Sequence, residues 1–231
     1  MKKAFLLFSF SLFVTFIFAQ NDKETKLKTI YNQGFNNDKS TDDFEFSNEG
    51  KWLISKMGKP GKSLKCSGKG DYTSAHEGPS IIAVLKNYVV SSFELEMTIQ
   101  QNGKNFDLLD FCIFFGIKDK EHYCYAQIAG HADKKTHNIF KVDGSKPEVT
   151  GQSLNKGVLW GINEWHNVKV IRDADEKTVK VYFDDELILE SSDESFEPGF
   201  IGFGSTSSAL KVDNIKLSTT EFTENTTSIF K

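Results

Sequence analysis

The segment HYCYAQIA, which begins at His122, carries the side chains best suited to binding chemistry. In an extended strand, Tyr123, Tyr125 and Gln127 lie on one face, while His122 and Cys124 lie on the other. Aromatic rings can cover the C–H surface of a sugar, and fixed amide or imidazole groups can bond its hydroxyls. Only one face can meet a ligand, and we favour the tyrosine face.

The predicted ligand-binding set adds groups from other segments to this face. A competing interpretation is that the tyrosines and tryptophans fill or rim the core, as a single aromatic side chain more often does. The predicted set is Tyr123, Tyr125, Gln127, His137, Asn138 and Trp160.

Catalysis by carboxylates would need two acidic groups across the bond that is cleaved. Glu94 and Glu96 share one face of the segment FELEMTI, but this spacing is also expected for a solvated strand face. A histidine and a tyrosine could instead act as base and acid, and the candidates are His122, His137 and Tyr125. The motifs G-x-S-x-G and H-E-x-x-H do not occur, so the catalytic residues stay unassigned.

The amino-terminal residues have the pattern of a secretory signal peptide. Lys2 and Lys3 precede an apolar run over residues 4–18, which ends at Ala19. The run is shorter than the roughly 20 residues of a membrane-spanning helix. We therefore predict a signal peptide over 1–19, export to the periplasm or the extracellular space, and no membrane insertion after its removal.

The charge pattern does not favour a nucleic-acid partner, because 28 basic and 32 acidic side chains give a net charge of −4 without any block of like charge. Three cysteines are too few for a disulfide framework. Cys112 and Cys124 flank a predicted hairpin and can form a bridge only if the register places them opposite each other. Buried free thiols are the state that we prefer, and no organic cofactor is indicated.

Most of the chain alternates β-rich runs with turns of Gly, Asp, Asn and Lys. Apolar and polar residues alternate in FELEMTI, NVKVIRD and TVKVYFDD, as they do in half-buried antiparallel strands. About a dozen strands with short turns and no clear amphipathic helix predict an all-β fold, a two-sheet antiparallel jelly-roll sandwich.

We predict one folded domain, over residues 41–217. Residues 20–40 are polar with little periodicity, which indicates a linker holding at most one short strand near 28–31. Residues 218–231 are expected to form a loose tail.

The last predicted strand changes parity in its middle. Leu210 and Val212 share one face, whereas Ile215 and Leu217 share the other. A β-bulge at Asp213–Asn214 would reconcile the two halves.

Several segments together resemble a known family. The order DDF (42–44), FELEMTI, FFGIKDKEHYCYAQIAG, EWHNVKVIRD, FEPGFIGFGS and VDNIKL is similar to secreted bacterial concanavalin A-like lectin/glucanase (laminin-G-like) domains, and this resemblance covers residues 41–217. Relatives include laminin-G-like modules, carbohydrate-binding modules, glycosidases, alginate lyases and 3-keto-disaccharide hydrolase domains. The resemblance implies a jelly roll but not one activity, since this fold carries all of them.

The resemblance also implies a structural calcium ion that ties the first and last strands together. Asp43, or its neighbour Asp42, and Asp213 occupy comparable places and supply the hard oxygen ligands that calcium prefers. The carboxylate motif of laminarinase-type enzymes, E-x-D-x-x-E, does not occur. Arg172 is the only arginine, which leaves little for bidentate recognition of uronates.

The expected function is that of a secreted carbohydrate-binding or polysaccharide-utilisation accessory domain, whose partner is a polysaccharide or oligosaccharide. One alternative is a glycoside hydrolase or polysaccharide lyase, which would need a cleft with convergent ionisable groups. A second alternative is a laminin-G-like protein-binding module, which a large exposed apolar patch would favour.

Overall fold

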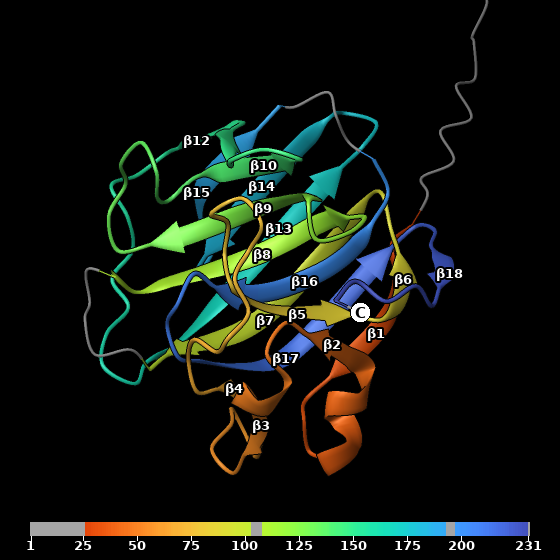
Figure 1. Cartoon of the computed structure of the whole chain (residues 1–231), viewed down its shortest axis with the longest axis vertical. Coiled ribbons are helices and arrows are strands. Elements are labelled where there is room, and N and C mark those ends of the chain that lie inside the picture. Colours follow the sequence, from red (N-terminus) through yellow and green to blue (C-terminus); the bar gives the residue numbers. More distant parts are fainter. Residues whose placement is uncertain (1–25, 103–107, 193–196, 231) are drawn as a thin grey trace, which may run out of the picture.

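The computed structural model describes residues 26–102, 108–192 and 197–230. Its described residues form 18 strands and two short 3-10 helices, η1 (Asp38–Asp43) and η2 (Glu49–Lys51). Every strand ladder is antiparallel, and two large sheets pack face to face (Figure 1). The predicted all-β, two-sheet jelly-roll sandwich is confirmed, while the predicted signal peptide over 1–19 lies outside the described residues.

The larger sheet has nine strands in the order β12-β15-β14-β13-β7-β17-β4-β3, and β1 pairs with β17 beside this path. Its strands are β1 (Lys28–Gln33), β3 (Trp52–Ser55), β4 (Ser63–Cys66), β7 (Phe93–Gln101), β12 (Gly151–Ser153), β13 (Trp165–Asp173), β14 (Thr178–Phe183), β15 (Glu186–Ser191) and β17 (Leu210–Thr219).

The second sheet has seven strands in the order β11-β10-β9-β8-β16-β5-β2. These are β2 (Phe44–Phe46), β5 (Ile81–Leu85), β8 (Asp110–Ile117), β9 (His122–Ala129), β10 (Ile139–Asp143), β11 (Glu148–Val149) and β16 (Phe200–Ser205). A separate two-stranded ribbon joins β6 (Asn87–Val89) and β18 (Thr223–Asn225).

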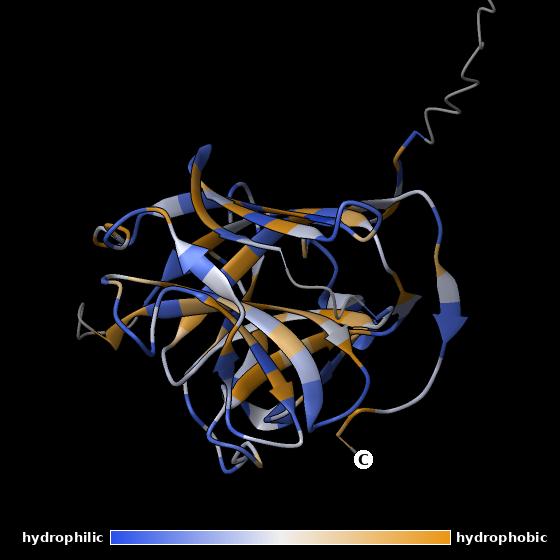
Figure 2. Cartoon of the chain, turned by 90° about the horizontal axis from the view of Figure 1, so that it is seen from above, coloured by the Kyte–Doolittle hydropathy of each residue, from blue (hydrophilic) through white to orange (hydrophobic). Residues whose placement is uncertain are grey.

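Strand alternation places one apolar face of each sheet in the shared core. In β7, Phe93, Leu95 and Met97 are buried, while Glu94 and Glu96 between them are half-buried. Hydrophobic stretches mark the strands of both layers in the view from above (Figure 2). Because each large apolar side chain that is buried contributes about 1.5–3 kcal/mol, this alternation is the main stabilising feature of the sandwich.

The outer face of the seven-stranded sheet is also apolar. A second cluster of buried side chains lies there, separate from the core between the sheets. It comprises Ile82, Val84, Cys112, Phe114, Ile117, Tyr123, Tyr125, Phe140, Val142, Phe200 and Ile229.

Two predicted boundaries are corrected by the strand pairing. Within the predicted linker, β1 pairs with β17 and Phe35 is completely buried, so the folded unit begins before residue 41. Within the predicted tail, β18 pairs with β6 and Ile229 is buried, so the tail is not loose. Both segments are polar in composition, but strand pairing and a few apolar anchors hold them.

The predicted β-bulge is confirmed, because the pairing of β17 with β7 shifts register between Asp213 and Lys216. The register of β8 and β9 pairs Cys112 with Gln127 and Cys124 with Phe115, so the two cysteines do not face each other. All three cysteines are free thiols, as we expected, but only Cys66 and Cys112 are buried, while Cys124 is half-buried. Among the described residues, no helix is long and apolar enough to cross a membrane.

Candidate functional site

The tyrosine face of β9 is not open. Tyr123 and Tyr125 do share the outer face of the sheet, as predicted, but each is only 5% exposed. In Figure 1 the segment 67–80 passes in front of β8 and β9. It packs so closely that a Cβ atom on Gly78 would lie 2.4 Å from the Tyr123 hydroxyl oxygen. The prediction that these tyrosines form an exposed sugar-binding face is therefore wrong.

Burial changes the chemistry of both phenols. Loss of solvent is the largest cause that raises the pKa of Tyr123, to about 12, and it also raises the pKa of Tyr125. The Tyr125 ring stacks on Phe140 with ring centroids 4.9 Å apart. Both tyrosines therefore stay neutral at physiological pH and act as packing residues.

Gln127 belongs to a buried polar network rather than to a ligand face. Its side-chain amide donates to Asp110 Oδ2 over 2.7 Å. The other oxygen of Asp110 accepts a hydrogen bond of 2.7 Å from the Ser205 hydroxyl. This network joins β8, β9 and β16 at one end of the sheet.

Trp160 and Asn138 also have structural contacts. The Trp160 indole donates to the backbone oxygen of Leu109 over 3.1 Å, and its ring meets Phe183 edge-on at 5.3 Å. Asn138 is half-buried, and its side-chain oxygen accepts from the backbone N–H of Ile139. The Trp160 ring is buried and therefore offers no open aromatic face to a ligand.

His137 is completely buried and is the clearest case of a predicted site residue with a structural role. Its Nδ1 atom accepts a hydrogen bond from Ala129 N–H over 3.1 Å, so the ring proton lies on Nε2, which contacts Asn155 Oδ1 at 2.7 Å. Burial disfavours the imidazolium and lowers the pKa of His137.

This lowered pKa predicts acid sensitivity. Below the usual histidine pKa the unfolded chain takes up a proton that folded His137 resists, so the free energy of unfolding falls as pH falls. Stability from this residue is fully present above the unfolded pKa. We expect urea unfolding at about pH 7.5 and about pH 5 to show a larger loss in the wild type than in His137→Gln. An equal loss in the two proteins would contradict this, and His131→Gln, which changes an exposed ring, is the control.

The three catalytic candidates are not brought together. His122 begins β9 on the opposite face from Tyr125, and His137 lies beside the far end of the same strand. At about 3.3 Å a residue, that strand separates the two histidines by about 20 Å. A base–acid pair formed from these residues is therefore not supported.

The other face of β9 does reach solvent, at His122. A pocket of about 460 Å³, here called the Tyr72 pocket, lies between segment 67–80 and the β8–β9 turn. It is lined by Tyr72, Thr73, Ala75, Asp119, Lys120, Glu121 and His122. One aromatic ring thus stands beside two acidic groups, a lysine and an imidazole.

A second pocket of about 240 Å³, the Arg172 pocket, lies on the other side of His122. Its lining includes Phe115, Lys118, His122, Cys124, Lys141, Asp143, Arg172 and Glu197. Arg172 comes from the nine-stranded sheet, and its guanidinium donates to the backbone oxygens of Ser91 and Glu197. Burial lowers the pKa of Arg172 to about 10, which still leaves it charged at neutral pH.

His122 is held between carboxylates where the two pockets meet. Its Nδ1 atom lies 2.8 and 2.9 Å from the two oxygens of Asp119, and Nε2 lies 3.8 Å from Asp143 Oδ1. Burial raises the pKa of Asp119, but hydrogen bonds from Glu121 N–H and His122 outweigh it and leave the pKa below its ordinary value. A hydrogen bond from Lys141 lowers the pKa of Asp143. Both carboxylates are therefore charged acceptors.

The two predicted calcium ligands accept hydrogen bonds from different partners. Tyr31 and Gln33 donate to Asp43 Oδ2, while Lys59 N–H and Asn214 N–H donate to Asp213. These partners are donors, whereas calcium needs six to eight oxygen ligands, and no group of three His, Cys, Asp or Glu suited to a metal occurs among the described residues. Calcium binding stays a prediction, which melting with and without calcium would test.

Sequence reasoning found His122 but missed Tyr72. The glycines Gly68, Gly70 and Gly78 mark the segment that carries Tyr72 as a loop, but nothing in the sequence says which strand that loop crosses.

Comparison with known proteins identifies the fold. No family model and no curated protein matches the chain. The carbohydrate binding module CBM66 from Bacillus subtilis is similar, with a TM-score of 0.56 and 18% identity over 77% of this chain and 96% of that chain. A protein of unknown function with a galectin-like fold, also from Bacillus subtilis, has a TM-score of 0.58 and 13% identity over 83% and 97%.

A longer enzyme is similar over part of its length. The xylan beta-1,4-xylosidase from Bacillus halodurans C-125 has a TM-score of 0.52 and 16% identity, over 81% of this chain but only 39% of that chain. The finer resemblance to 3-keto-disaccharide hydrolase domains stays a prediction. At such identities the likeness concerns architecture alone, and it supports the two-sheet jelly-roll fold of this chain.

Proposed function

We propose that this protein is a secreted carbohydrate-binding domain that recognises a polysaccharide or oligosaccharide at the Tyr72 pocket. The observation that carries the proposal is the open pocket itself, in which an aromatic ring lies beside Asp119, Glu121 and His122. The similarity of the fold to a carbohydrate-binding module supports it, and the signal-peptide pattern supports secretion.

The lining of the pocket suits sugar chemistry. The half-buried Tyr72 ring offers an apolar surface for sugar C–H groups, and the carboxylates can accept hydrogen bonds from hydroxyls. Asp119 already fixes the His122 ring, so little side-chain entropy is lost when a ligand binds.

Replacement of the pocket side chains is expected to weaken binding selectively. We expect Tyr72→Ala and His122→Ala each to raise the Kd for a bound glycan by at least about tenfold, because each removes a contact at the centre of the pocket. Titration calorimetry of the mature chain measures this.

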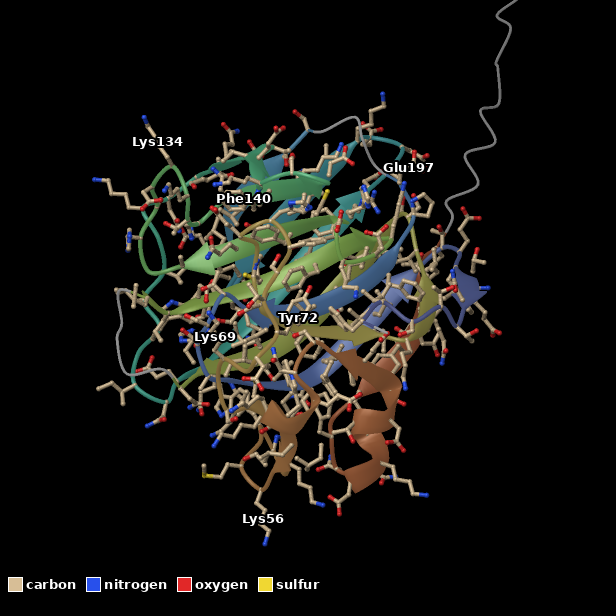
Figure 3. The ribbon with its side chains drawn as sticks, in the orientation of Figure 1. Lys56, Lys69, Tyr72, Lys134, Phe140 and Glu197 are labelled. Atoms are coloured by element: carbon tan, nitrogen blue, oxygen red, sulfur yellow. The ribbon has the colours of Figure 1, made fainter. Side chains whose placement is uncertain are left out.

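His131→Ala is the matched control. His131 is also exposed and pairs with an aspartate, Asp133, at 3.7 Å, but it follows the far end of β9. Figure 3 shows Lys134 of the same loop well away from Tyr72. Equal loss of affinity in His131→Ala and His122→Ala would place the ligand elsewhere.

An enzyme is the alternative that His122 favours. A histidine oriented by a carboxylate is the arrangement of a general base. New reducing ends or unsaturated uronates from a polysaccharide, lost in Asp119→Asn, would establish a hydrolase or lyase in place of a binding domain.

A protein-binding module is favoured by a different surface. Leu108, Leu159 and Ile162 are 64%, 90% and 76% exposed. The Trp160 hydrogen bond to Leu109 links the two segments that carry them. Exposed apolar patches of this kind are typical of partner-binding surfaces.

A further inference from the structure

The carboxy-terminal segment 226–230 lies across the outer face of the seven-stranded sheet. Strand β18 turns the chain back beside β6, and the residues after it reach β2. There the carboxylate of Glu45 accepts hydrogen bonds from the Ser228 hydroxyl and from the backbone N–H groups of Ile229 and Phe230, the last two at 2.8 Å each. One acidic side chain thus holds three consecutive residues.

Apolar contacts reinforce this attachment. Ile229 is buried in the outer-face cluster, and the Phe230 ring meets the Tyr72 ring at a centroid distance of 5.4 Å and an interplanar angle of 76°. The pocket where Ile229, Phe230 and Tyr72 pack on the sheet has a volume of only about 10 Å³. The chain end is therefore fitted to Tyr72.

Apart from the contact with Phe230, two hydrogen bonds attach the segment 67–80 near Tyr72, and one of them joins the hydroxyls of buried Ser74 and Tyr123 over 3.5 Å. The backbone N–H of Tyr72 donates to Asn48 Oδ1 over 2.9 Å. Further along, Glu77 pairs with Lys146 at 2.7 Å, and His76 lies 3.5 Å from Glu121 without hydrogen-bond geometry. The Glu77 pair is exposed, and exposed ion pairs contribute little to holding a loop in place.

We propose that residues 226–230 form a clasp that positions Tyr72, which makes Phe230 and Glu45 positioning residues for the Tyr72 pocket. The assignment of a sugar to that pocket rests on the proposed function, whereas the clasp itself does not. When Phe230 is released from Tyr72, one wall of the pocket loses its support and segment 67–80 opens more often.

Hydrogen–deuterium exchange of the full chain without ligand tests the clasp. We expect amides in residues 72–78 to exchange about fivefold faster in Phe230→Ala than in the wild type, the size expected for loss of an aromatic pair. Glu45→Gln should show the same direction, because its backbone partners lose a charged acceptor.

Phe222→Ala is the matched control. Phe222 lies in the same carboxy-terminal region and meets Tyr88, instead of Tyr72, at the same distance of 5.4 Å. It should leave exchange in residues 72–78 unchanged. If Phe230→Ala exchanges like Phe222→Ala there, the clasp is wrong, whether or not a glycan binds.

Glycan-binding measurements separate the clasp from the proposed carbohydrate site. The probes are xylan, laminarin and alginate, and calorimetry measures their binding to the wild type, Phe230→Ala and Phe222→Ala. If a glycan binds the wild type, Phe230→Ala should raise its Kd about fivefold while Phe222→Ala leaves it unchanged. An unchanged Kd in Phe230→Ala would refute a role in positioning. If residues 72–78 exchange faster in Phe230→Ala but the wild type binds no glycan, the result would support the clasp and count against the carbohydrate site.

Discussion

Asp110→Asn is expected to lower the free energy of unfolding by about 3 kcal/mol, because hydrogen bonds to a buried charged acceptor are among the strongest in a protein. The carboxylate of Asp110 is almost fully buried and accepts from Gln127, the Ser205 hydroxyl and the backbone N–H of Thr206. An amide in its place brings an NH₂ group against one of these donors.

Urea unfolding followed by circular dichroism measures this loss. Asp175→Asn is the matched control, because Asp175 is exposed in the turn between β13 and β14 and should change stability by less than about 0.5 kcal/mol. If the two variants were equally stable, the buried network would not be a main tie between β8, β9 and β16.

Gly204→Ala is expected to destabilise the protein by about 3 kcal/mol or to prevent folding, because the added methyl group would have no room beside the backbone of the neighbouring strand. A Cβ atom at this position of β16 would lie 1.7 Å from the backbone oxygen of Ile81 on β5. Since that neighbour is backbone, the two strands would have to separate.

Gly50→Ala provides the comparison, since a Cβ atom there would have no neighbour within 4 Å. Soluble yield and melting temperature should fall sharply for Gly204→Ala and stay close to the wild type for Gly50→Ala. A Gly204→Ala protein with wild-type melting temperature would show that β5 and β16 can move apart at little cost.

The sequence predicted the sheets well because the signal is local. Alternation in β7 and β13 follows directly from the two-residue period of a strand, and the parity change before Ile215 located the bulge in β17. The same period correctly separated Tyr123 from His122 on β9. These inferences need only neighbouring residues.

The covering of those faces could not be predicted, because it depends on distant segments. The period of β9 gives two faces but does not say that segment 67–80 and Ile229 cover one of them. Likewise, the sequence indicated a short strand near 28–31 but not that it belongs to the folded unit, because β1 is held by its pairing with β17 and by the buried Phe35. Long-range contacts override local composition at such places.

The most direct test of carbohydrate binding at the Tyr72 pocket is a polysaccharide screen on residues 20–231 that records melting temperature and product formation in the same samples. We expect at least one glycan to raise the melting temperature of the wild type without forming products, and we expect Tyr72→Ala to remove this shift while His131→Ala keeps it. A glycan that is cleaved would contradict a binding domain without catalysis, and a shift that survives in Tyr72→Ala would contradict binding at the Tyr72 pocket.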